Sequence, residues 1–268
     1  MKVKKLHEGI GYDGNRFHVR FFSNEDNDII DIAEPHITQS SFDNKTYYFG
    51  YEFKPEVSST VRGKFLRWIK GLDKESKPDE FTLENLVAMP IDELNRREKF
   101  SQFSCVLYPR SNRSELTHMI QRCVLNCIPR TKIKSFELVK NIPANVNFDW
   151  ELFDEHYDGE VGDTRYQQIS NYVNNDLLPK IHSLDYFSIA ENVKYKYRNY
   201  IMNFLTVPEE THDAFKALTN SDKVLIIDDI NTSGATLREM IRVVKTLAPE
   251  TTIYIFTLIG KGEKFDNV

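Results

Sequence analysis

From about residue 104 to the C-terminus, short apolar runs alternate with stretches of helical periodicity. The apolar runs predict four strands, at residues 104–108, 135–139, 223–228 and 252–259. Near-continuous apolar strands are typical of a sheet that is covered on both faces. Strands that alternate with helices indicate a parallel sheet. The pattern therefore predicts an α/β fold built on a parallel sheet.

Helical periodicity predicts helices at residues 114–127, 165–182 and 235–247. In the last of these, apolar residues recur at three- and four-residue spacing, which predicts one buried face. The residues of this apolar stripe are Leu237, Met240, Ile241, Val244 and Leu247.

The first hundred residues have a different pattern, with the strand-like runs FHVRFF and TYYFGYEF followed by an amphipathic helix around VRGKFLRWIKGL and another helix near 91–100. We interpret residues 1–100 as a separate N-terminal α+β module and residues 101–268 as the α/β domain. The first helix carries cations that are either a solvated face, which we favour, or a functional basic surface. These cations are Arg62, Lys64, Arg67 and Lys70.

An acidic segment interrupts the α/β pattern at about residues 147–163, where DWELFDEHYDGEVGD carries seven carboxylates. The segment lacks the ligand spacing and the central glycine of a calcium loop. We therefore predict a solvated acidic insertion and no protein metal site.

Composition and charge exclude several classes of protein. The chain has 268 residues, 40% hydrophobic and 28% charged, which is ordinary globular composition rather than that of a disordered protein. The net charge of -5 provides no general basic field, so nucleic-acid binding is disfavoured, although a local contact stays open. Three cysteines fit buried thiols in a reducing compartment. No apolar run approaches the roughly 18 residues of a membrane span, and we expect a cytoplasmic protein that does not bind membranes.

The chemistry is concentrated in Lys223 to Leu237, KVLIIDDINTSGATL. Asp228 and Asp229 come at the carboxyl end of a buried strand, where open α/β sheets bind ligands. The turn from Thr232 to Thr236 is rich in hydroxyl groups and leads into a helix, whose unpaired N–H groups and dipole favour an anion. Ionised carboxylates accept hydrogen bonds from a diol. The two halves together predict a ligand of the ribose 5-phosphate type.

The run VLIIDDINTSGAT resembles the 5-phosphoribosyl 1-pyrophosphate (PRPP) motif of type I phosphoribosyltransferases. The resemblance covers roughly residues 104 to 260 and implies a parallel-sheet core with a variable hood, for which the N-terminal module is a candidate. It implies that Asp228 and Asp229 hold the ribose hydroxyls and act in catalysis. It also implies Mg²⁺ as cofactor, bound mainly through PRPP. The residues implied for the 5-phosphate are Thr232, Ser233, Gly234, Ala235 and Thr236.

Two further family elements have looser matches in this sequence. After the strand at 104–108, Arg110, Ser111 and Arg113 are candidates for a pyrophosphate loop, although Ser114 before a helix is also an ordinary N-cap. In the run Lys194 to Arg198, Lys196 is a candidate pyrophosphate contact on a closing loop, and the alternative is an exposed edge strand. Lys140, just after the strand at 135–139, is a weaker candidate for the same contact.

One departure from the family pattern bears on the reaction. Purine-salvage members place an acid where this chain has Thr232, which disfavours a hypoxanthine-guanine type enzyme, whereas orotate-type and competence-associated (ComF-like) members tolerate threonine. Our first hypothesis is a phosphoribosyltransferase that binds PRPP or a ribose 5-phosphate-containing nucleotide. The alternative is a non-catalytic nucleotide sensor or a conflict-system effector. A homodimer or a partner protein, joined through the N-terminal module, is a further open expectation.

Overall fold

The computed structural model describes residues 8–12, 17–21, 28–31, 37–53, 57–72, 77–110, 115–127 and 134–260. The chain forms two compact units. The first unit consists of Met1–Ser135, Lys223–Asn231 and Ile253–Gly262. The second consists of Phe136–Asp222, Thr232–Thr252 and Glu263–Val268.

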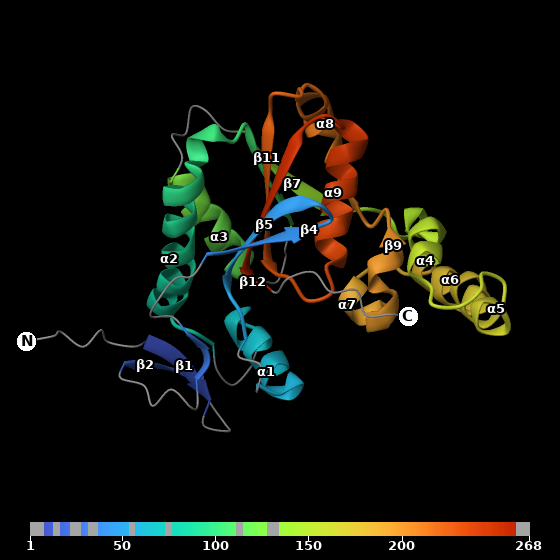
Figure 1. The fold of residues 1–268 in the computed structure, drawn as a ribbon, viewed down its shortest axis with the longest axis horizontal. Coiled ribbons are helices and arrows are strands. Elements are labelled where there is room, and N and C mark those ends of the chain that lie inside the picture. Colours follow the sequence, from blue (N-terminus) through green and yellow to red (C-terminus); the bar gives the residue numbers. More distant parts are fainter. Residues whose placement is uncertain are drawn as a thin grey trace, which may run out of the picture. The chain divides into compact units, whose positions relative to one another are not determined.

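The first unit contains five neighbouring strands of a sheet, drawn in Figure 1. In spatial order they are β6 (Cys105–Pro109), β11 (Lys223–Ile230), β12 (Thr252–Ile259), β5 (Lys45–Tyr51) and β4 (Thr38–Phe42). Strand β6 is parallel to β11, and β12 is parallel to β5, whereas β4 is antiparallel to β5. The predicted α/β class with parallel strands is confirmed.

Strand β5 pairs with β12, and its aromatic residues are buried, including Tyr47, Tyr48 and Phe49. It is joined to β4 by a two-residue turn in which Asp43 and Asn44 both have positive φ, 49° and 55°. Such turns match the twist of a hairpin and favour Asp and Asn at these positions. The TYYFGYEF strand thus belongs to the same unit as the predicted α/β strands. That residues 1–100 form a separate module stays a prediction.

Helices and a small sheet complete the described part of the first unit. The sheet is antiparallel, with β1 (Glu8–Tyr12) between β2 (Phe17–Phe21) and β3 (Asp28–Asp31). The helices are α1 (Ser59–Ile69), α2 (Glu80–Glu98), the short 3-10 helix η2 (Phe100–Gln102) and α3 (Glu115–Asn126). Buried side chains from these helices and from the strands form one apolar core that includes Phe65, Leu86, Ile120, Ile227 and Phe256.

The helix expected near 91–100 begins earlier, at Glu80. Asp79 caps its N-terminus, because the Asp79 carboxylate accepts the backbone N–H of Thr82 at 2.8 Å. The helix start was predicted too late because Asp79 was not recognised as its N-cap, although an Asp before an apolar-periodic segment is a common helix start.

The second unit contains short antiparallel strand pairs and several helices. Strand β7 (Lys134–Lys140), which begins in the first unit, pairs with β10 (Leu205–Thr206), and β8 (Asn147–Phe148) pairs with β9 (Ile201–Met202). The remaining elements, in chain order, are η3 (Pro143–Asn145), α4 (Trp150–His156), α5 (Thr164–Asn171), η4 (Tyr172–Leu177), α6 (Leu178–His182), α7 (Ile189–Asn192), η5 (Tyr195–Tyr200), α8 (Glu209–Lys216) and α9 (Ala235–Leu247).

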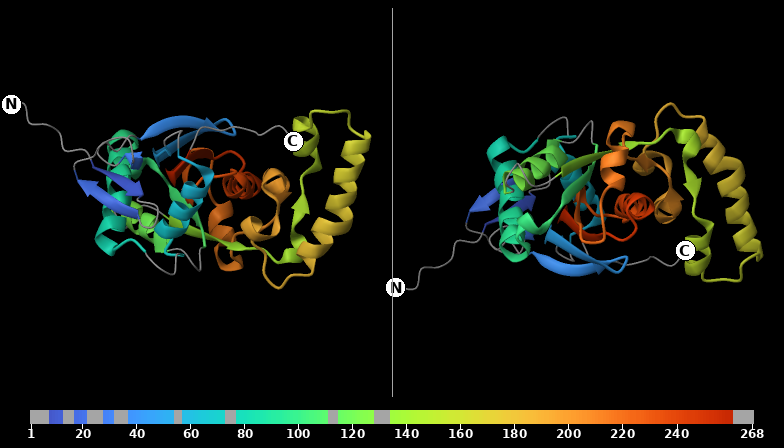
Figure 2. Two further views of the ribbon diagram at one scale, coloured as in Figure 1. Left: turned by 90° about the horizontal axis from the view of Figure 1, so that it is seen from below. Right: turned by 90° about the horizontal axis from the view of Figure 1, so that it is seen from above.

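The helix predicted at 165–182 is confirmed as one continuous run of α5, η4 and α6, seen in yellow in Figure 2. Its middle, η4, is a π-helix, in which the N–H of Leu178 bonds to the carbonyl of Val173, five residues back. Pro179 follows directly and has no N–H to donate, so the wider turn accommodates it without ending the helix.

Of the seven acids of the acidic segment, four are exposed and three are half-buried, and two of the half-buried acids cap helices. Asp149 caps α4 by accepting the N–H of Leu152 at 3.0 Å, and Asp163 caps α5 by accepting the N–H of Tyr166 at 2.7 Å. The hydrogen bonds from Tyr166 N–H and the Tyr157 hydroxyl hold the pKa of Asp163 below its usual value. Aromatic rings from this segment and from outside it form a packed cluster in which Phe153 is fully buried. The cluster consists of Phe148, Trp150, Phe153, Tyr157, Tyr166 and Tyr200.

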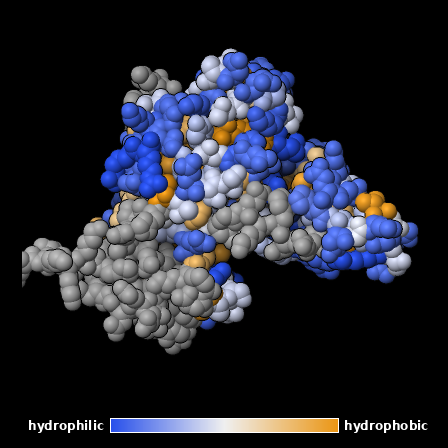
Figure 3. Space-filling view, in the orientation of Figure 1, coloured by the Kyte–Doolittle hydropathy of each residue, from blue (hydrophilic) through white to orange (hydrophobic). Residues whose placement is uncertain are grey.

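On the face drawn in Figure 3, apolar surface forms small areas separated by hydrophilic surface. Phe81 is the most exposed large hydrophobic side chain among the described residues, at 74%. Within the described part of the chain, no helix combines the length and the apolar character that crossing a bilayer requires.

The expected contact with a second copy or a partner protein stays a prediction.

The caps in the acidic segment give a stability prediction. Asp149→Ala removes the side-chain acceptor for the Leu152 N–H and should lower the free energy of unfolding by about 1 kcal/mol. Glu155→Ala is the matched control, because Glu155 is an exposed acid in the same helix. Urea denaturation of both variants measures the difference. Equal losses in the two variants would contradict the capping role of Asp149.

Candidate functional site

The two predicted acids are both buried at the end of β11. Asp228 is 7% exposed and Asp229 is 5% exposed. The strand was expected to end at Asp228, but it continues to Ile230, so both acids belong to the strand itself. The Asp229 N–H donates to Asp228 Oδ1 at 2.8 Å, which ties the first carboxylate to the backbone of the second acid.

Burial is the main cause that raises the pKa of Asp228 to about 7, and the neighbouring charge of Asp229 raises it further. Lys70 and the hydrogen bond from the Asp229 N–H oppose this shift. An Asp with a pKa near 7 changes its charge at physiological pH, which is a property of groups at functional sites.

Asp229 is held by two side chains from the N-terminal half of the chain. Lys70, the C-cap residue of α1, places its ammonium nitrogen 2.9 Å from Asp229 Oδ1. Thr117 on α3 donates its hydroxyl to Asp229 Oδ2 at 3.3 Å. Burial lowers the pKa of Lys70, but its interactions with Asp229 and the charge of Asp228 outweigh burial, so the pKa is raised overall.

For Lys70, the interpretation as part of a solvated face is wrong, since its side chain is 27% exposed and paired with a buried acid. Lys70 directly follows the buried residues Trp68 and Ile69, so it stands at the edge of the apolar face of α1. That position is the one local signal that could have identified it. The partner itself could not be predicted, because it lies 159 residues further along the chain.

Asn231 fixes the point where the chain leaves β11. Its backbone N–H donates to the carbonyl of Ile259 at 2.9 Å, and its side-chain amide donates to the Tyr47 hydroxyl at 3.3 Å. The Tyr47 hydroxyl also hydrogen-bonds the hydroxyl of Thr257 at 2.8 Å. Burial raises the pKa of Tyr47 to about 12, so it is a neutral hydroxyl at physiological pH. Strands β5 and β12 thereby anchor the residue that precedes the predicted phosphate turn.

In the second unit, the predicted phosphate turn has the backbone that its sequence requires. Gly234 has a φ of 86°, in the left-handed region that favours glycine, and it stands directly before α9. As the N-cap residue, Gly234 has no side chain that could cap the helix. The Ala235 N–H donates a long hydrogen bond of 3.4 Å to the Ser233 hydroxyl. Thr232 is exposed, and Ser233 and Thr236 are half-buried. The turn therefore presents hydroxyl groups at the positive end of a helix dipole.

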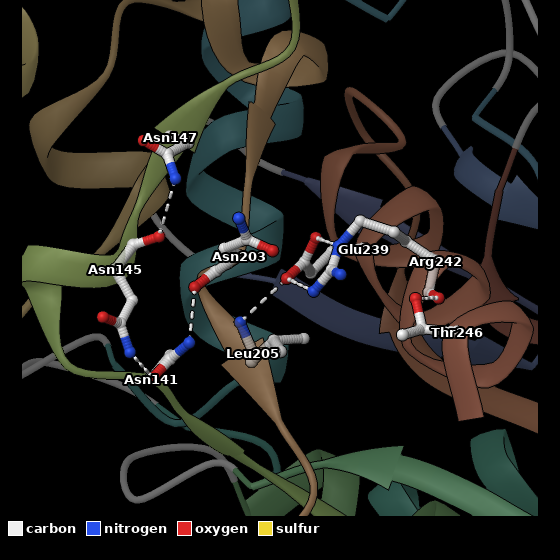
Figure 4. Close-up of polar contacts among 8 residues, drawn as sticks. All are labelled: Asn141, Asn145, Asn147, Asn203, Leu205, Glu239, Arg242 and Thr246. Carbon is white, nitrogen blue, oxygen red and sulfur yellow. Dashed lines mark hydrogen bonds and ion pairs between the residues drawn. The ribbon is translucent and has the colours of Figure 1, made fainter.

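A buried carboxylate anchors α9 one turn beyond this start, as Figure 4 shows. Glu239 is 2% exposed, and its Oε1 accepts both the backbone N–H of Leu205 at 3.1 Å and the Arg242 guanidinium at 2.8 Å. Oε2 accepts a second hydrogen bond from Arg242 at 2.8 Å. On the other side of β10, Asn141 donates to the carbonyl of Asn203 at 3.0 Å. Glu239, which links the helix of the phosphate turn to β10, was not among the predicted site residues.

Of the predicted pyrophosphate loop, Arg110 is described and is exposed just after β6. Ser111 and Arg113 lie outside the described residues. The arrangement of the loop around a ligand therefore stays a prediction.

The segment with Lys196 is a 3-10 helix, not an edge strand. Lys196 itself is exposed, with its ammonium group 4.7 Å from the ring centre of Tyr197. Arg198 donates to the carbonyls of Val193 and Ala190, which holds the segment in place. The Tyr195 hydroxyl donates to the carbonyl of Thr232 at 3.1 Å. The segment thus contacts the first residue of the phosphate turn.

Lys140 is engaged inside the second unit, where its ammonium group donates to the carbonyl of Phe187 at 2.7 Å and lies 4.1 Å from the ring centre of Tyr186. In the described residues, no group of three or more His, Cys, Asp or Glu side chains is arranged to hold a metal ion. Cys105 is buried as expected, whereas Cys123 and Cys127 are only half-buried.

No family model and no curated protein matches this chain. Among solved structures, the chain is similar to a hypoxanthine phosphoribosyltransferase from Staphylococcus aureus. The two share 11% sequence identity over 71% of this chain and 70% of that chain, with a TM-score of 0.36.

The raised pKa of Asp228 gives a prediction about stability and pH. A carboxyl group with a higher pKa in the folded than in the unfolded chain binds its proton more tightly when folded, so stability falls as pH rises from about 4 to about 7. Asp228→Asn removes this loss. It should therefore stabilise the protein more at pH 8 than at pH 5, by on the order of 1–3 kcal/mol.

Urea denaturation at the two pH values measures this difference. Asp176→Asn is the control, because Asp176 is exposed on η4 and its replacement should have the same effect at both pH values. If Asp228→Asn also has the same effect at pH 5 and pH 8, Asp228 is not the group that titrates.

Proposed function

We propose that this protein is a phosphoribosyltransferase-like protein that binds PRPP. The observation that carries the proposal is the buried acid pair, Asp228 and Asp229, followed within the same nine residues by a turn that starts a helix. Four peptide units separate Asp229 from Ser233, a span of no more than roughly 15 Å. Chain connectivity alone keeps the acids and the turn within reach of one small ligand.

The acids suit the ribose of such a ligand. Ionised carboxylates only accept hydrogen bonds, and the 2- and 3-hydroxyls of ribose are donors. The two side chains are held by hydrogen bonds to the protein, so little reorganisation is needed when a ligand binds. Their negative charge would also stabilise positive charge that develops on the neighbouring anomeric carbon.

The turn suits the 5-phosphate. Because Gly234 has no side chain, its backbone can come close to a ligand. The first N–H groups of α9 point out of the N-terminal end of the helix, which is the positive end of the helix dipole. The hydroxyls of Thr232, Ser233 and Thr236 add donors at this end of the helix. Within the second unit, the hydrogen bond from the Leu205 N–H to Glu239 would hold the helix that follows the turn.

In the proposed reaction, a nitrogen nucleophile forms a bond to the anomeric carbon of PRPP. The bond from that carbon to the pyrophosphate oxygen breaks, and pyrophosphate leaves with the electron pair. The protein provides positioning and charge and needs no nucleophile of its own. Thr232 stands where purine-salvage enzymes have an acid, so the proposal favours an acceptor other than hypoxanthine or guanine.

Mg²⁺ belongs to the proposal as a companion of pyrophosphate, whose charge it would neutralise. Lys70 already neutralises Asp229, so the acid pair is a better acceptor for hydroxyl groups than a ligand set for a divalent cation. We therefore expect Mg²⁺ to be bound by the oxygens of PRPP rather than by these carboxylates.

The alternative is a sensor that binds PRPP or a related nucleotide without turnover. An assay of pyrophosphate release across nucleobases separates the two. Binding without release for any base would identify the sensor.

Replacement of Gly234 tests the phosphate turn. Gly234→Ala should weaken ribose 5-phosphate binding at least about tenfold, because the added Cβ occupies the place where the phosphate approaches the backbone. Gly162→Ala is a matched control, since Gly162 also has a positive φ, of 95°, and space for a Cβ, but belongs to the acidic segment. Calorimetric titration of both variants measures the affinities. Wild-type affinity in Gly234→Ala would overturn the assignment of the turn.

The cations Arg110 and Lys196 test the pyrophosphate contact. Only PRPP carries an anomeric pyrophosphate, so Arg110→Ala and Lys196→Ala should each weaken PRPP more than ribose 5-phosphate, by about tenfold or less for an exposed charge. Lys180→Ala, at an exposed lysine on α6, should change neither affinity. An equal loss for the two ligands would show that the cation acts through the general field and does not contact the pyrophosphate.

A further inference from the structure

Lys70, Thr117 and the two acids form one chain of polar contacts inside the first unit. The Lys70 ammonium group lies 2.9 Å from Asp229 Oδ1, and the Thr117 hydroxyl lies 3.3 Å from Asp229 Oδ2. The Asp229 N–H then donates to Asp228 Oδ1 at 2.8 Å. Each oxygen of Asp229 therefore has its own side-chain donor, whereas Asp228 accepts a hydrogen bond from a backbone N–H.

Two carboxylates buried side by side cannot both be charged without a large cost in free energy. Lys70 supplies one positive charge, and it does so in direct contact with Asp229 rather than with Asp228. The contact has good hydrogen-bond geometry and a largely buried acid, so it is stronger than an exposed ion pair. The cluster thus treats its two acids unequally.

We propose that Lys70 is a positioning residue of this site, which keeps the negative charge on Asp229 and makes Asp228 the acid whose protonation changes. The proposal rests on the proposed function only for its effect on ligand binding. With Asp228 protonated, the cluster of Lys70, Asp229 and Asp228 is neutral, and Asp228 can donate as well as accept a hydrogen bond. With Asp228 ionised, the cluster has one negative charge, next to the position proposed for the anomeric carbon.

Other groups around the acids do not supply this asymmetry. From β5, the phenol of Tyr47 is neutral at physiological pH and hydrogen-bonds Thr257 of β12. From α3, Thr117 offers a neutral hydroxyl, and the neighbouring His118 is exposed. The charge of Asp229 raises the pKa of Asp228, and the charge of Lys70 lowers it.

Carbon NMR of the aspartate carboxyl groups, without any ligand, tests this role directly. In the wild-type protein we expect Asp228 to titrate near pH 7. Lys70→Met should move that midpoint upward by about one unit or more, because the positive charge of Lys70, which lowers the pKa of Asp228 without contacting it, is lost. Lys70→Arg should restore the midpoint, because it keeps the charge. Thr117→Val, which removes a neutral partner of Asp229, should move the midpoint much less.

Lys70→Gln repeats the test with a polar side chain that can still donate to Asp229, in case the Met variant does not fold. An unchanged midpoint in the charge-removing variants would overturn the proposal, and so would a failure of Lys70→Arg to restore it. A merely structural role would lower the melting temperature and leave the midpoint where it is.

Ribose 5-phosphate binding across pH 5.5–8.5 is the second measurement. We expect the pH dependence of the affinity to move in Lys70→Met by the same amount as the carboxyl midpoint. A pH dependence that stays in place while the carboxyl midpoint moves would contradict the link to the ligand. If the wild-type protein does not bind ribose 5-phosphate, the proposed function fails, and the ligand-free titration still decides the role of Lys70.

Discussion

The burial of two adjacent carboxylates at the end of an apolar strand is the constraint on which the candidate site depends. The strand residues before the acids, Val224 to Ile227, are fully buried, which fixes Asp228 and Asp229 in a region of low dielectric. Such a pair costs free energy unless protons, cations or donors compensate it. Lys70 and the backbone N–H of Asp229 provide part of this compensation, and a proton on Asp228 provides another part.

Residues from the N-terminal half of the chain contact the acid pair and the residue that follows β11. Helix α1 brings Lys70, α3 brings Thr117 and β5 brings Tyr47, which holds Asn231. A site that the sequence concentrates in one short segment is therefore supported by residues from three other elements. In the second unit, Glu239 on α9 accepts a hydrogen bond from β10, and the Tyr195 hydroxyl donates to the carbonyl of Thr232. These contacts hold the helix and the turn within that unit.

The sequence predicted what local pattern determines. The strands at 104–108, 135–139, 223–228 and 252–259 and the helices at 165–182 and 235–247 follow from apolar periodicity, and the structure confirms them within one or two residues. The left-handed Gly234 agrees with the small turn that the motif predicted. Contacts between residues far apart in the sequence could not be predicted from one chain. The pairing of Lys70 with Asp229 and the link from Glu239 to Leu205 are of this kind.

Predictions from charge composition were less informative than predictions from apolar periodicity. Charge predicted a solvated insertion at 147–163, and its acids are exposed or half-buried, but charge did not predict that Asp149 and Asp163 cap helices or that Phe153 and Tyr157 are buried between them. The pattern predicted one basic face for the four cations of α1 and its C-cap, whereas Lys70, at the C-cap, contacts a buried acid of the predicted site. In both cases individual positions relative to helix ends and apolar faces held more information than the sum of charges.

The proposed contact between the acid pair and the ribose diol can be tested by removing one hydroxyl group from the ligand. Calorimetric titration would compare ribose 5-phosphate with 2-deoxyribose 5-phosphate, which keeps the phosphate and loses one donor to the acids. If the acids hold the diol, the deoxy sugar should bind about tenfold or more weakly, since a buried charged acceptor loses its hydrogen bond. Equal affinities for the two sugar phosphates would contradict it.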